Sequence, residues 1–329
     1  MERAVEGMSV RDMHGWLPIR AWRRDGEWCL DWCWFGEQRL TRPFFRDDVD
    51  LALRLPFNQA FRRETGIQAL LDWQAASPGL APDAFVFHAS RCGSTLIAQM
   101  LACLDSHVVL SEPPPLDSLL RGHYEDELAG CAQEAAVVAM LSALGQAPSP
   151  SARHLVVKLD AWNLFELPIL RRCFPDTPWV FLYRDPLEIA ASHLRMPGMH
   201  MIPGQLGASP LNEAEEATVP REDYIARRLG RLLEQAAVMC RDYGGLALNY
   251  SELPHAAVGR LRESLRLAPD QLEVVMAASR QNAKRPGETF AADTQQKRDS
   301  APAALRDAVS RWAERPYQAL EALRLGQLR

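Results

Sequence analysis

Lysine is almost missing from this chain of 329 residues. Of its 37 basic side chains only three are lysines, namely Lys158, Lys284 and Lys297, and the other 34 are arginines. A lysine ammonium is a compact point charge, whereas an arginine guanidinium is a flat fork, so the two are not interchangeable. Each retained lysine is therefore a candidate for a specific role, with chance as the alternative.

Long apolar runs and a secretory signal are also missing. Residues 1–8 carry charge without an apolar segment, and the longest strongly apolar stretch, Ala135–Leu144, is far too short to span a bilayer. The net charge of -5 shows no basic surplus, which argues against a nucleic-acid partner. We therefore expect a cytoplasmic protein without a transmembrane segment. The sequence does not indicate its oligomeric state.

Cysteine is present but forms no recognisable framework. The seven cysteines are odd in number and irregularly spaced, which favours reduced thiols over disulfides. Cys29 and Cys33 are close in sequence, but no second Cys or His pair completes a zinc site. The sequence therefore predicts no bound metal.

Tryptophan, in contrast, is concentrated near the N-terminus. Six of the nine tryptophans lie in the first 80 residues: Trp16, Trp22, Trp28, Trp32, Trp34 and Trp73. Apolar residues on both sides of Asp25-Gly26 predict a β-hairpin there. We divide the chain into a β-rich, Trp-rich cap or accessory region (1–80) and a main domain (81–329). The cap either packs on the main domain or offers its tryptophans to a substrate.

Short apolar runs alternate with helical stretches beyond residue 81. This pattern is typical of an α/β fold with a parallel sheet flanked by helices. The expected strands are Ala84–His88, Val108–Leu110, His154–Lys158, Trp179–Tyr183 and Leu246–Tyr250. Such sheets bind ligands at the carboxyl ends of their strands, so the loops after these strands are expected to converge. The last helix, 301–325, is expected to break at Pro316.

The loop after the first of these strands has the composition of an anion site. Gly93 allows close approach of the backbone, Arg91 adds a forked cation, and Ser94 and Thr95 add hydroxyls at a helix start. A simple helix cap is the alternative. The loop lacks the first glycine and the lysine of the G-x-x-x-x-G-K-[ST] motif, so it differs from that of ATP- and GTP-binding enzymes.

The segment Arg91-Cys92-Gly93-Ser94-Thr95 resembles the 5′-phosphosulfate loop of the PAPS-dependent sulfotransferases. An arginine at its start is closer to the tyrosylprotein and carbohydrate sulfotransferases than to the cytosolic ones, which have lysine there. The resemblance covers roughly residues 84–325. It implies that residues 81–329 form a nucleotide-binding catalytic domain with a P-loop-like sulfotransferase fold. It also implies 3′-phosphoadenosine 5′-phosphosulfate (PAPS) as the sulfuryl donor.

A second segment, 182–192, resembles the 3′-phosphate motif of the same family. Arg184 stands at a strand end and Ser192 follows eight residues later on a helix. Two weaker matches imply further nucleotide contacts, from Tyr250 after a strand and from Lys284 and Arg285 in a basic loop. For Arg184 and Ser192 the alternative is a surface Arg–Asp pair with a serine in the helix interior. For the basic loop the alternative is a flexible, solvated loop.

Sulfuryl transfer to a hydroxyl needs a base and cations that stabilise the developing charge. Glu112 ends a strand before three prolines, and sulfotransferases of the tyrosylprotein and carbohydrate groups have a glutamate in a similar place. Lys158 and Asp160 end another strand, where the cytosolic enzymes have a lysine and a histidine base. Glu112 is therefore the expected base, Asp160 its rival and Lys158 an electrostatic helper, or else a partner of Asp160 in a salt bridge.

The sequence thus predicts a sulfotransferase that acts on a hydroxyl or amine of an acceptor it does not identify. Two alternatives remain open. A phosphotransferase would use ATP in the same loop, and a binding module would keep the nucleotide pocket without catalysis.

Overall fold

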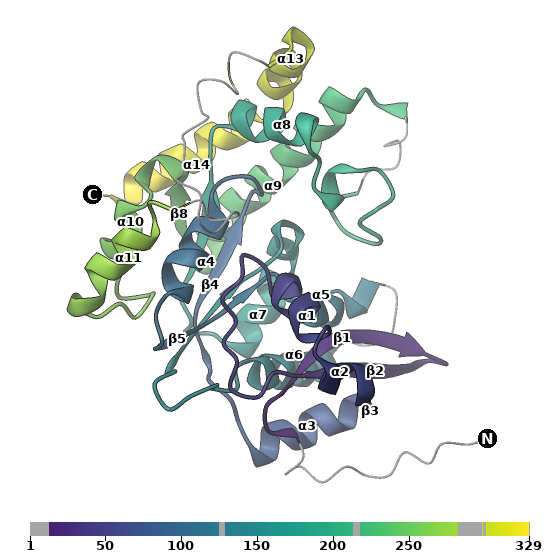
Figure 1. Ribbon diagram of the computed structural model, residues 1–329. Coiled ribbons are helices and arrows are strands. Elements are labelled where there is room, and N and C mark those ends of the chain that lie inside the picture. Colours follow the sequence, from purple (N-terminus) through teal and green to yellow (C-terminus); the bar gives the residue numbers. More distant parts are fainter. Residues whose placement is uncertain (1–12, 125–128, 213–217, 282–297, 299–300, 329) are drawn as a thin grey trace.

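The computed structural model describes residues 13–124, 129–212, 218–281, 298 and 301–328 (Figure 1). Its larger sheet has five strands in the order β5-β6-β4-β7-β8, and every neighbouring pair is parallel. These strands are β4 (Pro82–His88), β5 (His107–Ser111), β6 (His154–Lys158), β7 (Trp179–Tyr183) and β8 (Leu246–Asn249). Because all five run the same way, their carboxyl ends meet at one edge. This confirms the predicted α/β sheet.

Burial on both faces explains why these strands are nearly continuous apolar runs. All five residues of β7 are buried, as are all five of β5. Helices cover such a sheet on both sides, so no residue of a central strand faces water. The apolar runs therefore show which residues form the strands. The polar residues that follow these runs lie at the carboxyl edge of the sheet.

The helices connect and cover the strands. They are α4 (Ser94–Ala102), α5 (Pro114–Leu120), α6 (Gly130–Leu144), α7 (Leu167–Cys173), α8 (Pro186–Arg195), α9 (Arg221–Tyr243), α10 (His255–Val258), α11 (Leu272–Ala278), α13 (Ala303–Trp312) and α14 (Glu314–Gln327). Short 3-10 turns are η2 (Gly122–Tyr124), η3 (Ala161–Glu166), η4 (Met199–Met201), η6 (Tyr250–Glu252) and η7 (Pro269–Gln271). Helix α9 contacts α8, α13 and α14, which form a group above the sheet in Figure 1. None of the helices in the described ranges combines the length and apolar character needed to cross a membrane.

The predicted break at Pro316 is wrong by three residues. The helix ends at Trp312 and restarts at Glu314, so Pro316 lies in the first turn of α14. Proline is tolerated there because the first amides of a helix have no intrahelical acceptor to lose. The chain therefore turns before the proline.

The N-terminal region forms a smaller antiparallel sheet in the order β1-β2-β3. Its strands are β1 (Trp16–Arg24), β2 (Glu27–Trp34) and β3 (Arg63–Gly66). Helices α1 (Phe45–Ala52) and α2 (Pro56–Ala60) lie between β2 and β3 in the chain, and α3 (Ile67–Ala76) follows β3. Asp25 and Gly26 both have positive φ, of 53° and 87°, as a two-residue hairpin turn requires. The predicted hairpin and β-rich elaboration are thus confirmed.

One continuous apolar core joins this cap to the large sheet. It runs from Leu30 and Leu70 in the cap to Phe87 and Leu182 in the sheet. Helix α5 contacts β1, and α6 contacts both β1 and α3. The division of the chain at residue 80 into two domains stays a prediction.

Candidate active site

The loop that joins β4 to α4 is shaped like a cradle for an anion. Ser90, Arg91 and Gly93 all have positive φ, of 61°, 50° and 92°, so the loop curls back on itself before α4 begins at Ser94. Ser94 and Thr95, at the start of the helix, are buried. The first amides of a helix lack intrahelical acceptors and carry the positive end of its dipole. The loop and helix start together therefore favour a negatively charged ligand.

Gly93 has two reasons to be glycine. Its φ of 92° is unfavourable for any other residue. A Cβ built on it would also lie 2.5 Å from Cδ2 of the Tyr250 ring. Tyr250 is thus in direct contact with the loop, and the two sequence-predicted residues are brought together.

The cysteine of the loop does not face the same way as its neighbours. Cys92 is fully buried, and its thiol donates to the Leu182 carbonyl at 3.1 Å. Burial raises the pKa of this thiol to about 12, so it stays protonated at neutral pH. Cys92 can therefore offer a ligand only its backbone amide.

Arg91 is held at the rim of the loop. Its guanidinium donates to the Met196 carbonyl at 3.0 Å, which links the loop to the segment after α8. Burial, followed by the nearby charge of Arg195, lowers the pKa of Arg91, while Glu112 acts in the opposite sense. An arginine has so high a starting pKa that it remains a cation. Arg91 thus supplies a fixed positive charge at the loop, within electrostatic reach of Glu112.

Arg184 leaves the end of β7 and stacks on Tyr250. Its guanidinium carbon lies 4.4 Å from the centre of the ring, and its Nε donates to the buried carboxylate of Glu188. Glu188 also accepts from Arg298 at 2.8 Å. Ser192, two turns along α8, is buried as well. The second predicted motif therefore lies beside the first, with Tyr250 between them.

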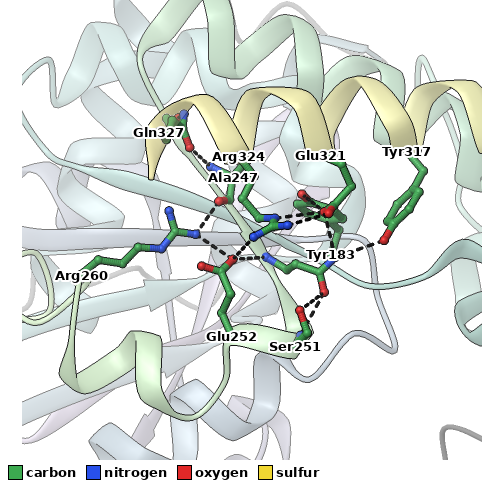
Figure 2. A network of polar contacts seen from close by, with 11 residues as sticks. Tyr183, Ala247, Ser251, Glu252, Arg260, Tyr317, Glu321, Arg324 and Gln327 are labelled. Carbon is green, nitrogen blue, oxygen red and sulfur yellow. Dashed lines mark hydrogen bonds and ion pairs between the residues drawn. The ribbon is translucent and has the colours of Figure 1, made fainter. Parts of the chain in front are cut away.

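A network of polar side chains fixes the strand ends that carry Arg184 and Tyr250 (Figure 2). Tyr183, just before Arg184, donates its hydroxyl to Oε1 of Glu321 at 2.6 Å. Asn249, just before Tyr250, donates to the same oxygen at 2.9 Å. Helix α14 thereby clamps β7 to β8. Sequence analysis missed Glu321 because nothing in a helix pattern shows which strands it faces.

Glu112 and Lys158 meet across two neighbouring strands. Ser111 at the end of β5 is paired with Lys158 at the end of β6, so the next residue, Glu112, lies beside the lysine. The buried ammonium donates to Oε1 of Glu112 and, at 3.2 Å, to Oγ of Ser111. The alternative in which Lys158 pairs with Asp160 is thus replaced by a pair with Glu112.

His88, the last residue of the expected strand Ala84–His88, completes this group. The Ser90 amide donates to its Nδ1 at 2.9 Å, so the ring proton stands on Nε2. Nε2 then donates to Oε1 of Glu112 at 3.1 Å. A histidine that ends a strand directly before an anion loop was the signal that could have revealed it.

The environment of Glu112 keeps its carboxylate ionised. Burial acts to raise its pKa, but the Lys158 ammonium and the His88 hydrogen bond outweigh burial and hold the pKa well below its usual range. Both contacts fall on Oε1, and among the described residues no hydrogen bond reaches Oε2. Oε2 is therefore available to accept a proton.

Asp160 is in the opposite electrostatic situation. Burial raises its pKa well above the usual value, and the neighbouring carboxylates of Glu112 and Asp117 raise it further. A carboxyl group of this kind holds its proton to higher pH and can donate a hydrogen bond. Glu112 and Asp160 thus have distinct protonation tendencies in one site.

Two histidines and a tryptophan close the site on the side of α8. The His200 ring lies 5.5 Å from Trp162 and 5.3 Å from His193. Burial, and then the charges of His193 and Arg228, lower the pKa of the fully buried His200 well below its usual value. His200 is therefore a neutral imidazole at neutral pH.

Two predicted residues, Lys284 and Arg285, lie outside the described residues. Within the described ranges, no group of three or more His, Cys, Asp or Glu side chains is arranged to hold a metal ion.

Among solved structures, the proteins to which this chain is similar include sulfotransferases. No protein-family model matches the sequence, and no curated protein matches it. The chain is similar to the sulfotransferase domain from the curacin biosynthetic pathway, at 16% identity over 71% of this chain and 97% of that one, with a TM-score of 0.45. It is similar to a sulfotransferase from Alicyclobacillus acidocaldarius, at 14% identity over 74% and 96%, with a TM-score of 0.43. It is also similar to the sulfotransferase domain of a Synechococcus olefin synthase, at 16% identity over 75% and 95%, with a TM-score of 0.42.

Proposed function

We propose that this chain is a sulfotransferase that moves a sulfuryl group from PAPS to a hydroxyl or amine of an acceptor. The observation that carries the proposal is the position of Glu112. Its carboxylate is anchored through one oxygen by Lys158 and His88, and its other oxygen stays available beside the anion loop. A base next to a cradle for a charged donor is what group transfer to a hydroxyl requires.

The loop fits a phosphosulfate in shape and charge. The backbone at Gly93 leaves no room for a side chain against Tyr250, and Arg91 supplies the fixed cation. We assign Arg91, the backbone of Cys92–Thr95 and the hydroxyls of Ser94 and Thr95 to the 5′-phosphosulfate. Arg184 and Ser192 are assigned to the 3′-phosphate and Tyr250 to the junction between them, with Lys284 and Arg285 as further candidates for phosphate contacts.

The site also favours one subtype. The first residue of the anion loop motif is an arginine, Arg91. The proposed base is Glu112, which follows β5, and no histidine stands two residues after Lys158 at the end of β6. Both features agree with the tyrosylprotein and carbohydrate type rather than with the cytosolic type.

Each side chain has a defined part in the transfer. The acceptor hydroxyl loses its proton to Oε2 of Glu112 as its oxygen bonds to sulfur. The bond between sulfur and the bridging phosphate oxygen breaks, and its electron pair leaves with adenosine 3′,5′-bisphosphate. Lys158 and Arg91 stabilise the negative charge that develops on the phosphate and on the sulfuryl oxygens. Asp160, whose pKa burial raises well above its usual value, is assigned to a hydrogen bond with the acceptor.

Calorimetric titration tests the donor. Adenosine 3′,5′-bisphosphate should bind tightly and ATP with magnesium weakly, and Arg184→Ala should lose most of the bisphosphate affinity. Preference for ATP with magnesium would instead support a phosphotransferase. Bisphosphate binding without any transfer from labelled PAPS, across a panel of hydroxyl acceptors, would support a binding module.

A further inference from the structure

The segment between β2 and α1 runs from the cap along α4 towards the carboxyl edge of the large sheet. Arg39 donates to the Ala102 carbonyl at 2.9 Å and pairs with Asp105 at 2.6 Å, both at the far end of α4. Two residues later, the Thr41 carbonyl accepts from Gln99 at 3.3 Å, about one turn nearer the start of that helix. The cap is thus laid against the helix that begins in the anion loop.

A buried carboxylate fixes the course of this segment. Asp48, in the first turn of α1, accepts from the backbone amides of Thr41 at 3.4 Å and Arg42 at 3.1 Å. Phe45, the first residue of the same helix, is buried in the core. The two residues between these anchors, Pro43 and Phe44, are therefore held in place by the protein itself.

Pro43 and Phe44 contact the group that surrounds the proposed base. The Ser111 hydroxyl donates to the Pro43 carbonyl at 2.7 Å. The Lys158 ammonium lies 5.0 Å from the centre of the Phe44 ring. Ser111 and Glu112 are the hydrogen-bond acceptors of that same ammonium. The cap therefore reaches the side chain that anchors the base, through direct contacts.

These contacts restrict the direction in which the ammonium points. A hydroxyl has a single proton, so a Ser111 side chain that donates to Pro43 can only accept from Lys158. The face of an aromatic ring attracts an ammonium, more strongly where water is excluded, and Lys158 is 1% exposed. A carboxylate or an amide in the place of the ring would compete with Glu112 for the protons of the ammonium. The ring attracts the charge without such competition.

We infer that Phe44 is a positioning residue of the proposed active site, which holds the Lys158 ammonium against Oε1 of Glu112 so that Oε2 is left for the acceptor proton. Phe44 acts through the lysine and not on the reacting atoms. The segment of the cap that ends at Phe44 is then a working part of the site, although it comes from outside the α/β sheet. This inference rests on the proposed sulfotransferase function.

The scarcity of lysine makes the contact directly measurable in the full chain. Protein labelled with ¹³C at lysine Cε gives one set of NMR signals for each of the three lysines, and Lys284→Arg and Lys297→Arg identify the set that belongs to Lys158. The ring current of Phe44 should displace the Lys158 signals. Phe44→Leu should remove this displacement, and Phe44→Tyr, which keeps the ring, should retain it.

Transfer from labelled PAPS to the best acceptor of the hydroxyl panel measures the consequence for the reaction. Phe44→Leu should lower kcat about two- to thirtyfold, the worth of one cation–π contact, while the Kd for adenosine 3′,5′-bisphosphate stays unchanged. Phe44→Tyr should restore kcat. Phe61→Leu is the matched control, because Phe61 is an exposed ring of the cap that contacts Phe57 at 5.0 Å, and it should change neither kcat nor the Lys158 signals.

The outcomes separate the two levels of the proposal. Lys158 signals that move in Phe44→Leu, together with a lower kcat at constant bisphosphate affinity, support the positioning role. Signals that do not move overturn it, and so do signals that move while kcat stays that of the parent; in both cases the sulfotransferase proposal is intact. A parent protein that binds no bisphosphate, or transfers to no acceptor of the panel, overturns the proposed function and the role of Phe44 with it.

Discussion

The Tyr250 ring touches both Gly93 and Arg184. A Cβ on Gly93 would lie 2.5 Å from the ring, and the guanidinium carbon of Arg184 lies 4.4 Å from its centre. One aromatic side chain therefore joins the two segments that the sequence marks as phosphate sites. Displacing the ring should disturb both.

Gly93→Ala should weaken binding of adenosine 3′,5′-bisphosphate by at least about tenfold, because the new methyl group displaces Tyr250 in addition to straining the backbone. Calorimetric titration measures the change. Gly204→Ala is the control for strain alone, since Gly204 also has positive φ, of 74°, but has no atom near a built Cβ. Equal bisphosphate affinity in the two variants would contradict the role assigned to the Gly93–Tyr250 contact.

Glu112→Gln should lower kcat by about 10²- to 10⁴-fold, the usual range for loss of a general base. The Kd for the bisphosphate should change little, because the amide keeps the size of the carboxylate. Asp160→Asn should have a smaller effect on kcat, since Asp160 is assigned to a hydrogen bond with the acceptor and not to removal of its proton. If Asp160→Asn abolishes transfer while Glu112→Gln does not, the two roles must be exchanged.

Lys158→Met should destabilise the protein most at neutral pH. In the parent the folded pKa of Glu112 is depressed, so its contribution to stability is present above the unfolded value of about 4.3 and is lost as pH falls through the folded pKa. Without the ammonium, burial dominates and raises that pKa. The stability gap between parent and variant should therefore widen from about pH 3 to pH 7, towards about 3–5 kcal/mol. Urea unfolding across this range measures it, and a gap independent of pH would contradict the pairing.

Glu321→Ala should reduce the unfolding free energy by about 1–3 kcal/mol, because Tyr183 and Asn249 lose their shared acceptor. It should also weaken bisphosphate binding several-fold, since the ends of β7 and β8 carry Arg184 and Tyr250. Glu314→Ala on the same helix is the control, as Glu314 is half-buried and bonds only Gln318 among the described residues. Loss of stability with unchanged bisphosphate affinity would limit Glu321 to a structural role.

Cys92 should resist alkylation in the folded protein. Its thiol is buried with a pKa of about 12, whereas Cys103 and Cys131 are exposed. Mass spectrometry after brief iodoacetamide treatment should find Cys103 and Cys131 modified first. Early modification of Cys92 would mean that the loop after β4 opens more readily than its contacts indicate.

The sequence predicted the parts of the site that lie in one continuous stretch. The strand before Arg91, the glycine of the loop and the helix start follow from local patterns, as does the hairpin at Asp25-Gly26. The partner of Lys158 did not follow, because the pairing with Glu112 depends on β5 and β6 being neighbours, and strand order is not written in any local pattern. His88 and Glu321 were missed for the same reason, since their partners lie 24 and 138 residues away in Glu112 and Tyr183.

Helix α5 rests on β1 of the cap, and its start follows Glu112 directly. The donor contacts, in contrast, come from the ends of β4, β7 and β8. The position of the proposed base is thereby set from the cap, whereas the proposed nucleotide contacts are set by the sheet. An insertion or deletion in the cap should move Glu112 relative to the nucleotide without moving the nucleotide itself.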